Sequence, residues 1–500
     1  MRILGSIRLR SLRWAGKLPR RTSTEVHALL LAAVIVVTVA VWLFWICATS
    51  MGTYDFSTYY AAASALRSDP HADIYSQAVL NRSGALGHVA TQPPLPFAYP
   101  PVAALLLVPL TLFPFATAAR IWLGLNATLW LVSSLILCAE VCALFPLRDP
   151  VARAAPTPAA RSSGRVGSPW ASWVAEPQRL ALCAATMLVC LAWGPAVFAL
   201  GLGQIDFVVL LPLALAFPLL RTRHDSWAGV ALGFAGMVKL APVVLLVYLA
   251  LLGRWRAAVA GLVTLVVLAL ATVMIVGPQT VWAAAPQMIQ ISADDANLPH
   301  NEALLGAVTR ALVTAAPAHA GGIRTVERLL LAALAVAVGV TLWQLRHRPR
   351  SCADTATNAI TGLSYAIALC AMVLVLPLAW EHHYVWVLPA AVLVLSAALQ
   401  GLFVSASENK RRQAAMRLGV AVGAMFLVGA LRSVGWDNAV WHVAPQVAGL
   451  SLGTWLHELR PIGAVILLLL LILAARRERR NGVGAESDSR HDVPGKPAEQ

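Results

Sequence analysis

Long apolar runs separated by short polar stretches make up almost the whole chain. A run of about 20 mostly apolar residues crosses the hydrocarbon core of a bilayer as one α-helix. Such spans are predicted at 27–49, 120–144, 179–200, 205–220, 257–276, 325–345, 359–379, 384–403, 415–434 and 461–475. Three more apolar runs are short or interrupted, at 101–114, 228–238 and 241–252. The pattern therefore predicts an all-α polytopic membrane protein with roughly 10–13 transmembrane helices.

Basic residues collect in the short loops on one side of these spans. The positive-inside rule places such loops in the cytoplasm, together with the N-terminus. The clusters are Arg221/Arg223, Arg254/Arg256, Arg346/Arg348/Arg350, Lys410/Arg411/Arg412 and Arg476/Arg477/Arg479/Arg480. The outer face then receives 51–98, 201–206, 277–302, 380–384 and 436–460. Residues 228–252 must enter and leave from the cytoplasmic side as two half-helices, which fits the break at Lys239 and Pro242.

One part of this topology stays open, between residues 99 and 178. If both 101–114 and 120–144 cross the membrane, the basic segment 146–178 faces outward. Its arginines and the downstream spans favour the inside instead. Either 101–114 lies along the membrane interface, or this part of the chain contains one more crossing.

The chain divides into a basic leader, a membrane body and a polar tail. The leader, 1–26, precedes an apolar run longer than the ~7–15 residue core of a signal peptide, so we expect a retained helix and a cytoplasmic leader. The body, 27–475, is predicted to be one transmembrane domain. It contains a long outer loop at 51–98 that carries amphipathic helices and a flexible loop at 146–178 rich in Pro, Ala and Ser. The tail, 476–500, is predicted to be disordered and cytoplasmic.

Composition excludes an ordinary soluble protein. Charged residues make up 12% of the chain, whereas soluble domains contain about 25%. The net charge of +15 could suggest a nucleic-acid partner, but the basic residues follow the membrane topology and we expect none. The cysteines lie mostly in apolar runs without CxxC or Cys/His spacing, and no acidic pair has a nucleotide-sugar context. No metal site and no cofactor are predicted.

Acidic and aromatic residues meet at the start of the outer loop. Asp55 stands among aromatic residues that include Tyr59 and Tyr60. Tyr59, Ala63 and Leu66 recur at i, i+4 and i+7, which predicts a helix lying on the membrane with an aromatic face. The tyrosines alone could belong to an aromatic belt at the headgroup level. Asp55 is harder to explain in that way, because burial near apolar rings raises the pKa of a carboxyl. Such a group could act as a general base at neutral pH.

Other polar residues in or near the spans allow two interpretations each. Lys239 either marks a functional site, because an intramembrane lysine is costly, or extends to the cytoplasmic surface. His382 and His383 either orient a carboxylate or form an interfacial pair beside aromatic residues. Glu381 is a competing acid, and Asn301 could cap a helix.

Several short motifs, in this order, resemble glycosyltransferase family 87. They are D-x-x-x-Y-Y-x-A at 55–62, YPP at 99–101, GQ at 203–204 and G-x-x-x-G-x-x-x-x-x-K-x-x-P at 229–242. The resemblance extends over about residues 50–400. It implies the GT-C architecture of integral membrane sugar transferases, among them the mycobacterial polyprenol-phosphate-mannose-dependent α-mannosyltransferases of phosphatidylinositol mannoside assembly.

The resemblance also implies a reaction. A hexosyl unit, mannose in the relatives named, would pass with inversion from a polyprenyl-phosphate donor to a lipid or glycan acceptor on the outer face of a bacterial plasma membrane. Asp55 would be the base, with His382 or His383 near it. Candidates for binding the substrates and the leaving phosphate are Tyr59, Tyr60, Tyr99, Gln204, Lys239, Asn301, Arg310 and Glu381. The main alternative is a transporter of lipid-linked or small polar substrates, which would favour inverted repeats.

Overall fold

A computed structural model describes residues 53–144, 177–294, 301–304, 306, 320–347, 354–404, 408–429, 446–447, 450–451, 459–474 and 476. Most of these residues are helical, and short 3₁₀ helices, turns and loops connect the α-helices. The described strands are two short antiparallel ones, β1 (Gln446–Val447) and β2 (Leu450–Ser451), which pair Gln446 with Ser451. The predicted all-α polytopic class is confirmed. The leader, the first predicted span, nearly all of the 146–178 loop and the tail beyond 476 lie outside the described residues.

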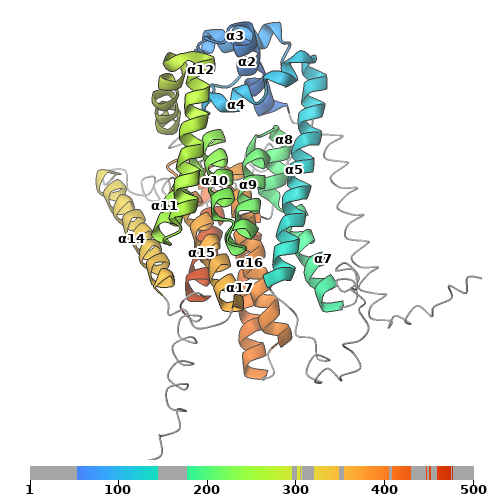
Figure 1. The fold of residues 1–500 in the computed structure, drawn as a ribbon, viewed down its shortest axis with the longest axis vertical. Helices are drawn as coiled ribbons and strands as arrows, with labels where there is room; N and C mark the ends of the chain where they lie inside the picture. The colour runs from blue at the N-terminus through green and yellow to red at the C-terminus, as the bar shows by residue number, and fades with distance from the viewer. Residues whose placement is uncertain are drawn as a thin grey trace, which may run out of the picture.

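The body is a bundle of helices that stand side by side (Figure 1). They are α5 (Phe115–Leu144), α7 (Pro177–Leu191), α8 (Gly194–Leu202), α9 (Asp206–Arg221), α10 (Asp225–Val238), α11 (Val244–Leu251), α12 (Trp255–Asp294), α14 (Ala320–Arg346), α15 (Asp354–Leu374), α16 (Leu388–Val404) and α17 (Glu408–Gly429). A further apolar helix covers Leu459–Ala474. Within the described ranges, four helices are long and apolar enough to cross a membrane, or five if α7 and α8, bent by 40°, form one span.

The described part of the outer-loop segment and the apolar run that follows it together fold into a cap at one end of the bundle (Figure 1). It consists of α2 (Tyr54–Ser68), α3 (Gln77–Leu86), α4 (Pro101–Leu105) and the 3₁₀ helix η1 (Val108–Leu112). Most residues of α2 are buried, because the helix packs against the other three. Tyr60 donates a hydrogen bond to the Phe113 carbonyl oxygen (2.7 Å). Tyr59 and Tyr60 therefore lie inside the cap and form no aromatic belt, whereas Tyr54 is half exposed.

The apolar run 101–112 forms the short pieces α4 and η1. Twelve helical residues rise about 18 Å, well short of the ~30 Å hydrocarbon core. Both pieces contact α2 at the cap end. Among the described residues between 99 and 144, α5 is the helix long and apolar enough to cross a membrane. At the other end of α5, Glu140 pairs with Arg221 at the end of α9 (2.7 Å). α5 thus ends on the side of the basic loops, which agrees with the alternative in which 101–114 does not cross.

The helices α10 and α12 touch through their backbones. A Cβ atom added at Gly229 would lie 2.0 Å from the Ala257 carbonyl oxygen, and one at Gly233 would lie 2.4 Å from that of Gly261. Small residues spaced by four allow this close approach between membrane helices. The two glycines of the G-x-x-x-G motif thus have a packing role, and they fix the position of the lysine that ends the motif.

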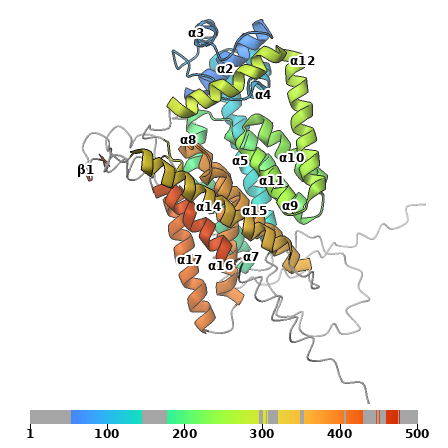
Figure 2. The ribbon, with the colours of Figure 1, turned by 90° about the vertical axis from the view of Figure 1, so that its left-hand side faces the viewer.

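The predicted break between two half-helices is present. α10 ends at Val238, and Lys239 has extended backbone angles (φ −138°, ψ 134°). The short 3₁₀ helix η4 (Ala241–Val243) and then α11 follow. A second break divides α12 at Gly277, whose φ of 82° favours glycine. The part of α12 after Gly277 turns across the bundle beneath the cap (Figure 2), where the sequence predicted an outer loop.

Candidate active site

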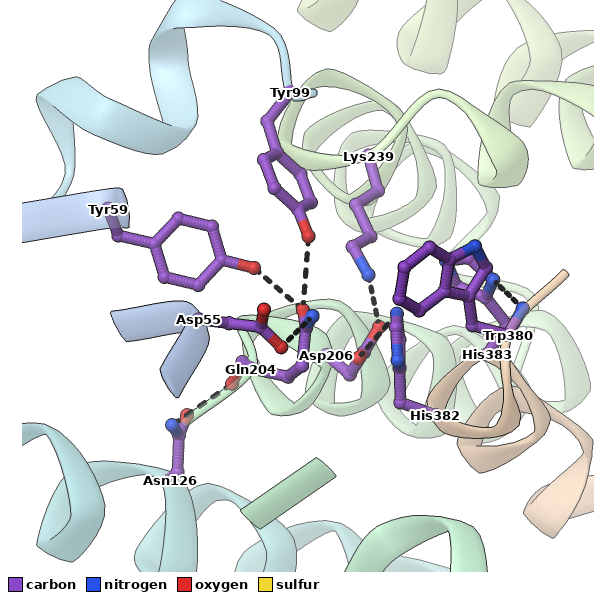
Figure 3. A network of polar contacts seen from close by, with 10 residues as sticks. All are labelled: Asp55, Tyr59, Tyr99, Asn126, Gln204, Asp206, Lys239, Trp380, His382 and His383. Carbon is purple, nitrogen blue, oxygen red and sulfur yellow. Dashed lines mark hydrogen bonds and ion pairs between the residues drawn. The ribbon is translucent and has the colours of Figure 1, made fainter. Parts of the chain in front are cut away.

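A buried polar cluster lies where the cap meets the bundle (Figure 3). Five separate segments contribute to it. They are α2 with Asp55 and Tyr59, the loop before α4 with Tyr99, the turn from α8 to α9 with Gln204 and Asp206, the α10–η4 break with Lys239, and the 3₁₀ helix η7 (Glu381–Val387) with His382 and His383. All but Asp206 were predicted site residues.

Asp55 is held by Gln204. The Gln204 Nε2 amide donates to Asp55 Oδ2 (2.7 Å), and its Oε1 accepts from the hydroxyls of Tyr59 (2.6 Å) and Tyr99 (3.2 Å). The Gln204 backbone is fixed in turn, because Asn126 Nδ2 donates to its carbonyl oxygen (3.1 Å). The two tyrosines therefore set the orientation of the amide, and the amide sets that of the carboxyl group. Among the described residues, Asp55 Oδ1 has no hydrogen-bond partner, which leaves that oxygen for a substrate.

Burial determines the acidity of Asp55. Desolvation disfavours the charged carboxylate and raises the Asp55 pKa to about 6. The Gln204 hydrogen bond and the positive charge of Lys239 oppose this shift, while the negative charge of Asp206 adds to it. A carboxylate with this pKa is mostly ionised at pH 7 and is more basic than an exposed aspartate. Asp55 thus has the properties of a general base.

Lys239 is buried beside the second carboxylate. Its Nζ donates to Asp206 Oδ1 (2.7 Å), and the two side chains are 6% and 0% exposed. The ammonium also lies over the rings of Tyr99 and Trp386, 5.3 Å and 5.2 Å from their centroids, in cation–π contact. Lys239 therefore does not extend to the cytoplasmic surface. It holds a positive charge inside the cluster.

The two histidines have different partners. His382 Nε2 lies 3.9 Å from Asp206 Oδ2, and the backbone N–H of Trp380 donates to His383 Nδ1 (2.9 Å). Their rings contact each other at 4.4 Å between centroids. The carboxylate beside His382 is thus Asp206, on the far side of the cluster from Asp55 (Figure 3). The expected contact between a histidine and Asp55 is not formed.

Other predicted residues support the surroundings of the cluster. Asn301 Oδ1 accepts from the backbone N–H groups of Ala303 and Ala379 (3.0 and 3.1 Å) and joins two chain segments. Glu381 forms an ion pair with Arg460 (2.7 Å), which also binds Glu302. These contacts secure the segment that leads into η7. Arg310 lies outside the described residues.

Three residues of the site and its surroundings were not predicted from the sequence: Asp206, Trp386 and Arg460. Asp206 had a usable signal, because an acid that opens an apolar span is costly unless it is paired. Trp386 resembles any other aromatic residue of an apolar run. Arg460 lies 158 residues from its partner Glu302 along the chain. At that separation, no local sequence pattern indicates that the two residues form a pair.

Three cysteines meet away from this cluster. Within the described part of the chain, the group that could ligate a metal consists of Cys138, Cys142 and Cys183, whose sulfur atoms lie within 4.8 Å of one another. They belong to α5 and α7, on the side of the basic loops. The sequence did not indicate this grouping, because Cys183 follows the long 146–178 segment. The expectation that the protein uses no metal stays a prediction.

Most of the segments that form the cluster lie in a region that matches a known protein family. The sequence model of glycosyltransferase family 87 matches residues 97–377, more than half of the chain. The chain belongs to glycosyltransferase family 87. The family 87 region includes Tyr99, Gln204, Asp206 and Lys239, and it begins after Asp55 and ends just before the two histidines.

Two mycobacterial proteins are similar in sequence to this chain. Both carry the name polyprenol-phosphate-mannose-dependent alpha-(1-2)-phosphatidylinositol mannoside mannosyltransferase. The relative from Mycobacterium tuberculosis is 27% identical over 318 residues, which are 62% of this chain and 64% of the relative. That from Mycolicibacterium smegmatis is 27% identical over 334 residues, 64% of this chain and 66% of the relative. The alignments thus span slightly less than two thirds of the relatives' own lengths. No solved structure matches the chain.

Proposed function

We propose that this family 87 protein transfers a mannosyl unit from a polyprenyl-phosphate donor to a lipid or glycan acceptor. Family membership supports sugar transfer, and the names of both relatives support the polyprenyl-phosphate mannose donor. The observation that carries the proposal is the pairing of a base with a cation. Asp55, with one oxygen available, and the Lys239 ammonium lie in one buried cluster. Gln204 hydrogen-bonds both Asp55 and the Tyr99 hydroxyl, and the Lys239 ammonium lies over the Tyr99 ring.

The chemistry follows from this arrangement. Asp55 Oδ1 takes the proton of an acceptor hydroxyl, and the oxygen attacks the anomeric carbon of the donor from the side opposite the phosphate. The bond between that carbon and the phosphate oxygen breaks, and polyprenyl phosphate leaves with the electron pair. Lys239 stabilises the charge that develops on the leaving oxygen. The configuration at the anomeric carbon inverts, because a single displacement occurs.

The site is proposed to open to the outer face of a bacterial plasma membrane. The basic loops lie at the end of the bundle opposite the cap, and the positive-inside rule places them in the cytoplasm. A lipid-linked donor reaches such a site through the bilayer, whereas a nucleotide sugar would remain in the cytoplasm. Since polyprenyl phosphate bears one phosphate group, a single lysine can neutralise much of its charge.

A labelling experiment tests the proposal. The purified full-length protein is reconstituted with mycobacterial membrane lipids and given radiolabelled polyprenyl-phosphate mannose or, in parallel, GDP-mannose. We expect label to reach lipid or glycan from the first donor only, in a linkage that α-mannosidase cleaves. Transfer from GDP-mannose alone, or no transfer from any of a panel of polyprenyl-phosphate sugars, would contradict the proposed donor class.

The pKa of Asp55 predicts the pH dependence of transfer. Only the ionised carboxylate can accept a proton, so the rate should rise with pH through about 6 and then level off. At pH 5, about a tenth of the protein has the ionised group. Replacing Gln204 with Leu removes a hydrogen bond that favours the ionised form, and the midpoint should move to higher pH. Single-turnover rates from pH 4.5 to 8 measure both curves. The same midpoint in both proteins would show that another group controls the rate.

A further inference from the structure

Among the described residues, the half of the polar cluster around Lys239 contains most of the buried side-chain atoms without a hydrogen bond, and Asn126 Oδ1 is a further one on the Asp55 side. Around Asp55, the Gln204 amide uses both its nitrogen and its oxygen in hydrogen bonds. Around Lys239, three buried side-chain atoms make no hydrogen bond within the described part of the chain. They are Asp206 Oδ2, His382 Nδ1 and Trp386 Nε1. Folded proteins contain few such atoms, and each needs an explanation. Three of them around one buried ammonium indicate that a ligand completes this half.

Trp386 is the most informative of the three. Its side chain is 1% exposed, so bulk water does not reach the indole N–H. Its ring lies under the Lys239 ammonium at 5.2 Å and beside the His383 ring at 5.0 Å. Leaving a buried donor without an acceptor is costly, whereas a phenylalanine would provide the same ring contacts without that cost. Packing therefore accounts for the ring of Trp386 and leaves its N–H unexplained.

The missing partner is best matched by a phosphate group. An indole N–H can only donate, and Lys239 has three N–H donors, of which Asp206 takes one. An indole that can only donate, next to a charged lysine, favours a ligand group that accepts only and carries negative charge. A phosphate has several such oxygens and can bind both side chains at once, with charge-assisted hydrogen bonds.

We propose that Trp386 recognises the phosphate of the lipid-linked donor by donating its indole hydrogen bond to a phosphate oxygen that Lys239 also binds. This inference rests on the proposed function and adds to it a residue that determines donor affinity. Trp386 holds the phosphate in the ground state and in the leaving group alike. Its loss should therefore change binding of the donor more than the rate of transfer from the bound donor.

A binding experiment on Trp386→Phe tests the inference. Phenylalanine keeps an aromatic ring beside Lys239 and removes the N–H. The full-length protein is placed in phosphatidylcholine nanodiscs, and Kd is measured for polyprenyl phosphate, for the phosphate-free polyprenol and for phosphatidylinositol. We expect the variant to bind polyprenyl phosphate about 10-fold or more weakly and the other two ligands as the wild type does. The control, Trp130→Phe, removes an indole N–H that donates to the Cys190 carbonyl oxygen, and it should leave all three values unchanged.

The outcomes separate this inference from the proposed function. If the wild type binds polyprenyl phosphate no better than polyprenol, the donor class is wrong and both proposals fall. If the wild type prefers polyprenyl phosphate and Trp386→Phe binds it equally well, the inference alone is overturned. Weaker binding of phosphatidylinositol only would overturn the assignment to the donor.

A second measurement does not depend on folding of the Phe variant. In wild-type protein with ¹⁵N-labelled indoles, one N–H resonance should shift on addition of polyprenyl phosphate and not of polyprenol. Its absence from Trp386→Tyr would assign it to Trp386. A Trp386 resonance that does not move on saturation with polyprenyl phosphate would overturn the inference.

Discussion

Replacement of Asp55 with Asn should lower the rate of sugar transfer about a thousandfold and leave the fold and donor affinity nearly intact. The amide oxygen of asparagine can still accept the Gln204 hydrogen bond, which is 2.7 Å in the wild type. The substitution removes the ability to take a proton, and a hydroxyl that keeps its proton is a poor nucleophile. A buried carboxyl with a raised pKa is also expensive to keep charged, so the neutral amide should not destabilise the cap.

The measurement compares single-turnover transfer from polyprenyl-phosphate mannose by equal amounts of folded wild type and variant. Asp73→Asn is the matched control, because Asp73 is an exposed acid of the same outer-loop segment whose side chain accepts a hydrogen bond from the backbone N–H of Tyr75. Its rate should equal that of the wild type. If Asp55→Asn retains more than about a tenth of the wild-type rate, another group accepts the proton of the acceptor hydroxyl. Asp206 is then the next acid to test.

Replacement of Lys239 with Met should abolish transfer and also destabilise the protein by about 3–5 kcal/mol. The lysine has two roles that this single change removes together. It neutralises Asp206, which is fully buried, and it is the proposed cation for the leaving phosphate. Among the described residues, the other basic group in contact with that carboxylate is His382 at 3.9 Å, which compensates the charge only when its imidazole is protonated.

A second substitution separates these roles. In the double variant Lys239→Met/Asp206→Asn, no unpaired charge remains, so thermal stability in detergent should return close to that of the wild type while transfer stays absent. Arg412→Met, at an exposed basic residue on the side of the basic loops, serves as the control for loss of a positive charge and should change neither quantity. Transfer at the wild-type rate by the double variant would show that Lys239 has a structural role only.

Much of the site could be predicted from the sequence, because polar residues within or beside membrane spans stand out from their apolar surroundings. Asp55, Lys239 and the two histidines are polar groups where apolar ones are expected, and such groups are costly unless they are used. Gln204 and Tyr99 were found through short motifs of the family. The roles of these residues were less accessible. Asn301 and Glu381 proved to make structural contacts, and His382 faces Asp206 instead of Asp55.

The sequence alone determined the class, the approximate spans and the side of the basic loops, because hydrophobic length and charge position act locally along the chain. Tertiary structure decided which polar groups meet. The run 101–112 stays in the cap because it packs against α2. Tyr59, Tyr60 and Tyr99 turn inward because Gln204 and the Phe113 carbonyl group accept their hydrogen bonds. The Lys239–Asp206 pair joins residues 33 positions apart. The Trp386 ring, which belongs to a third segment, lies against the ammonium of this pair. Such contacts depend on helix packing in three dimensions, and no periodic pattern in one dimension encodes them.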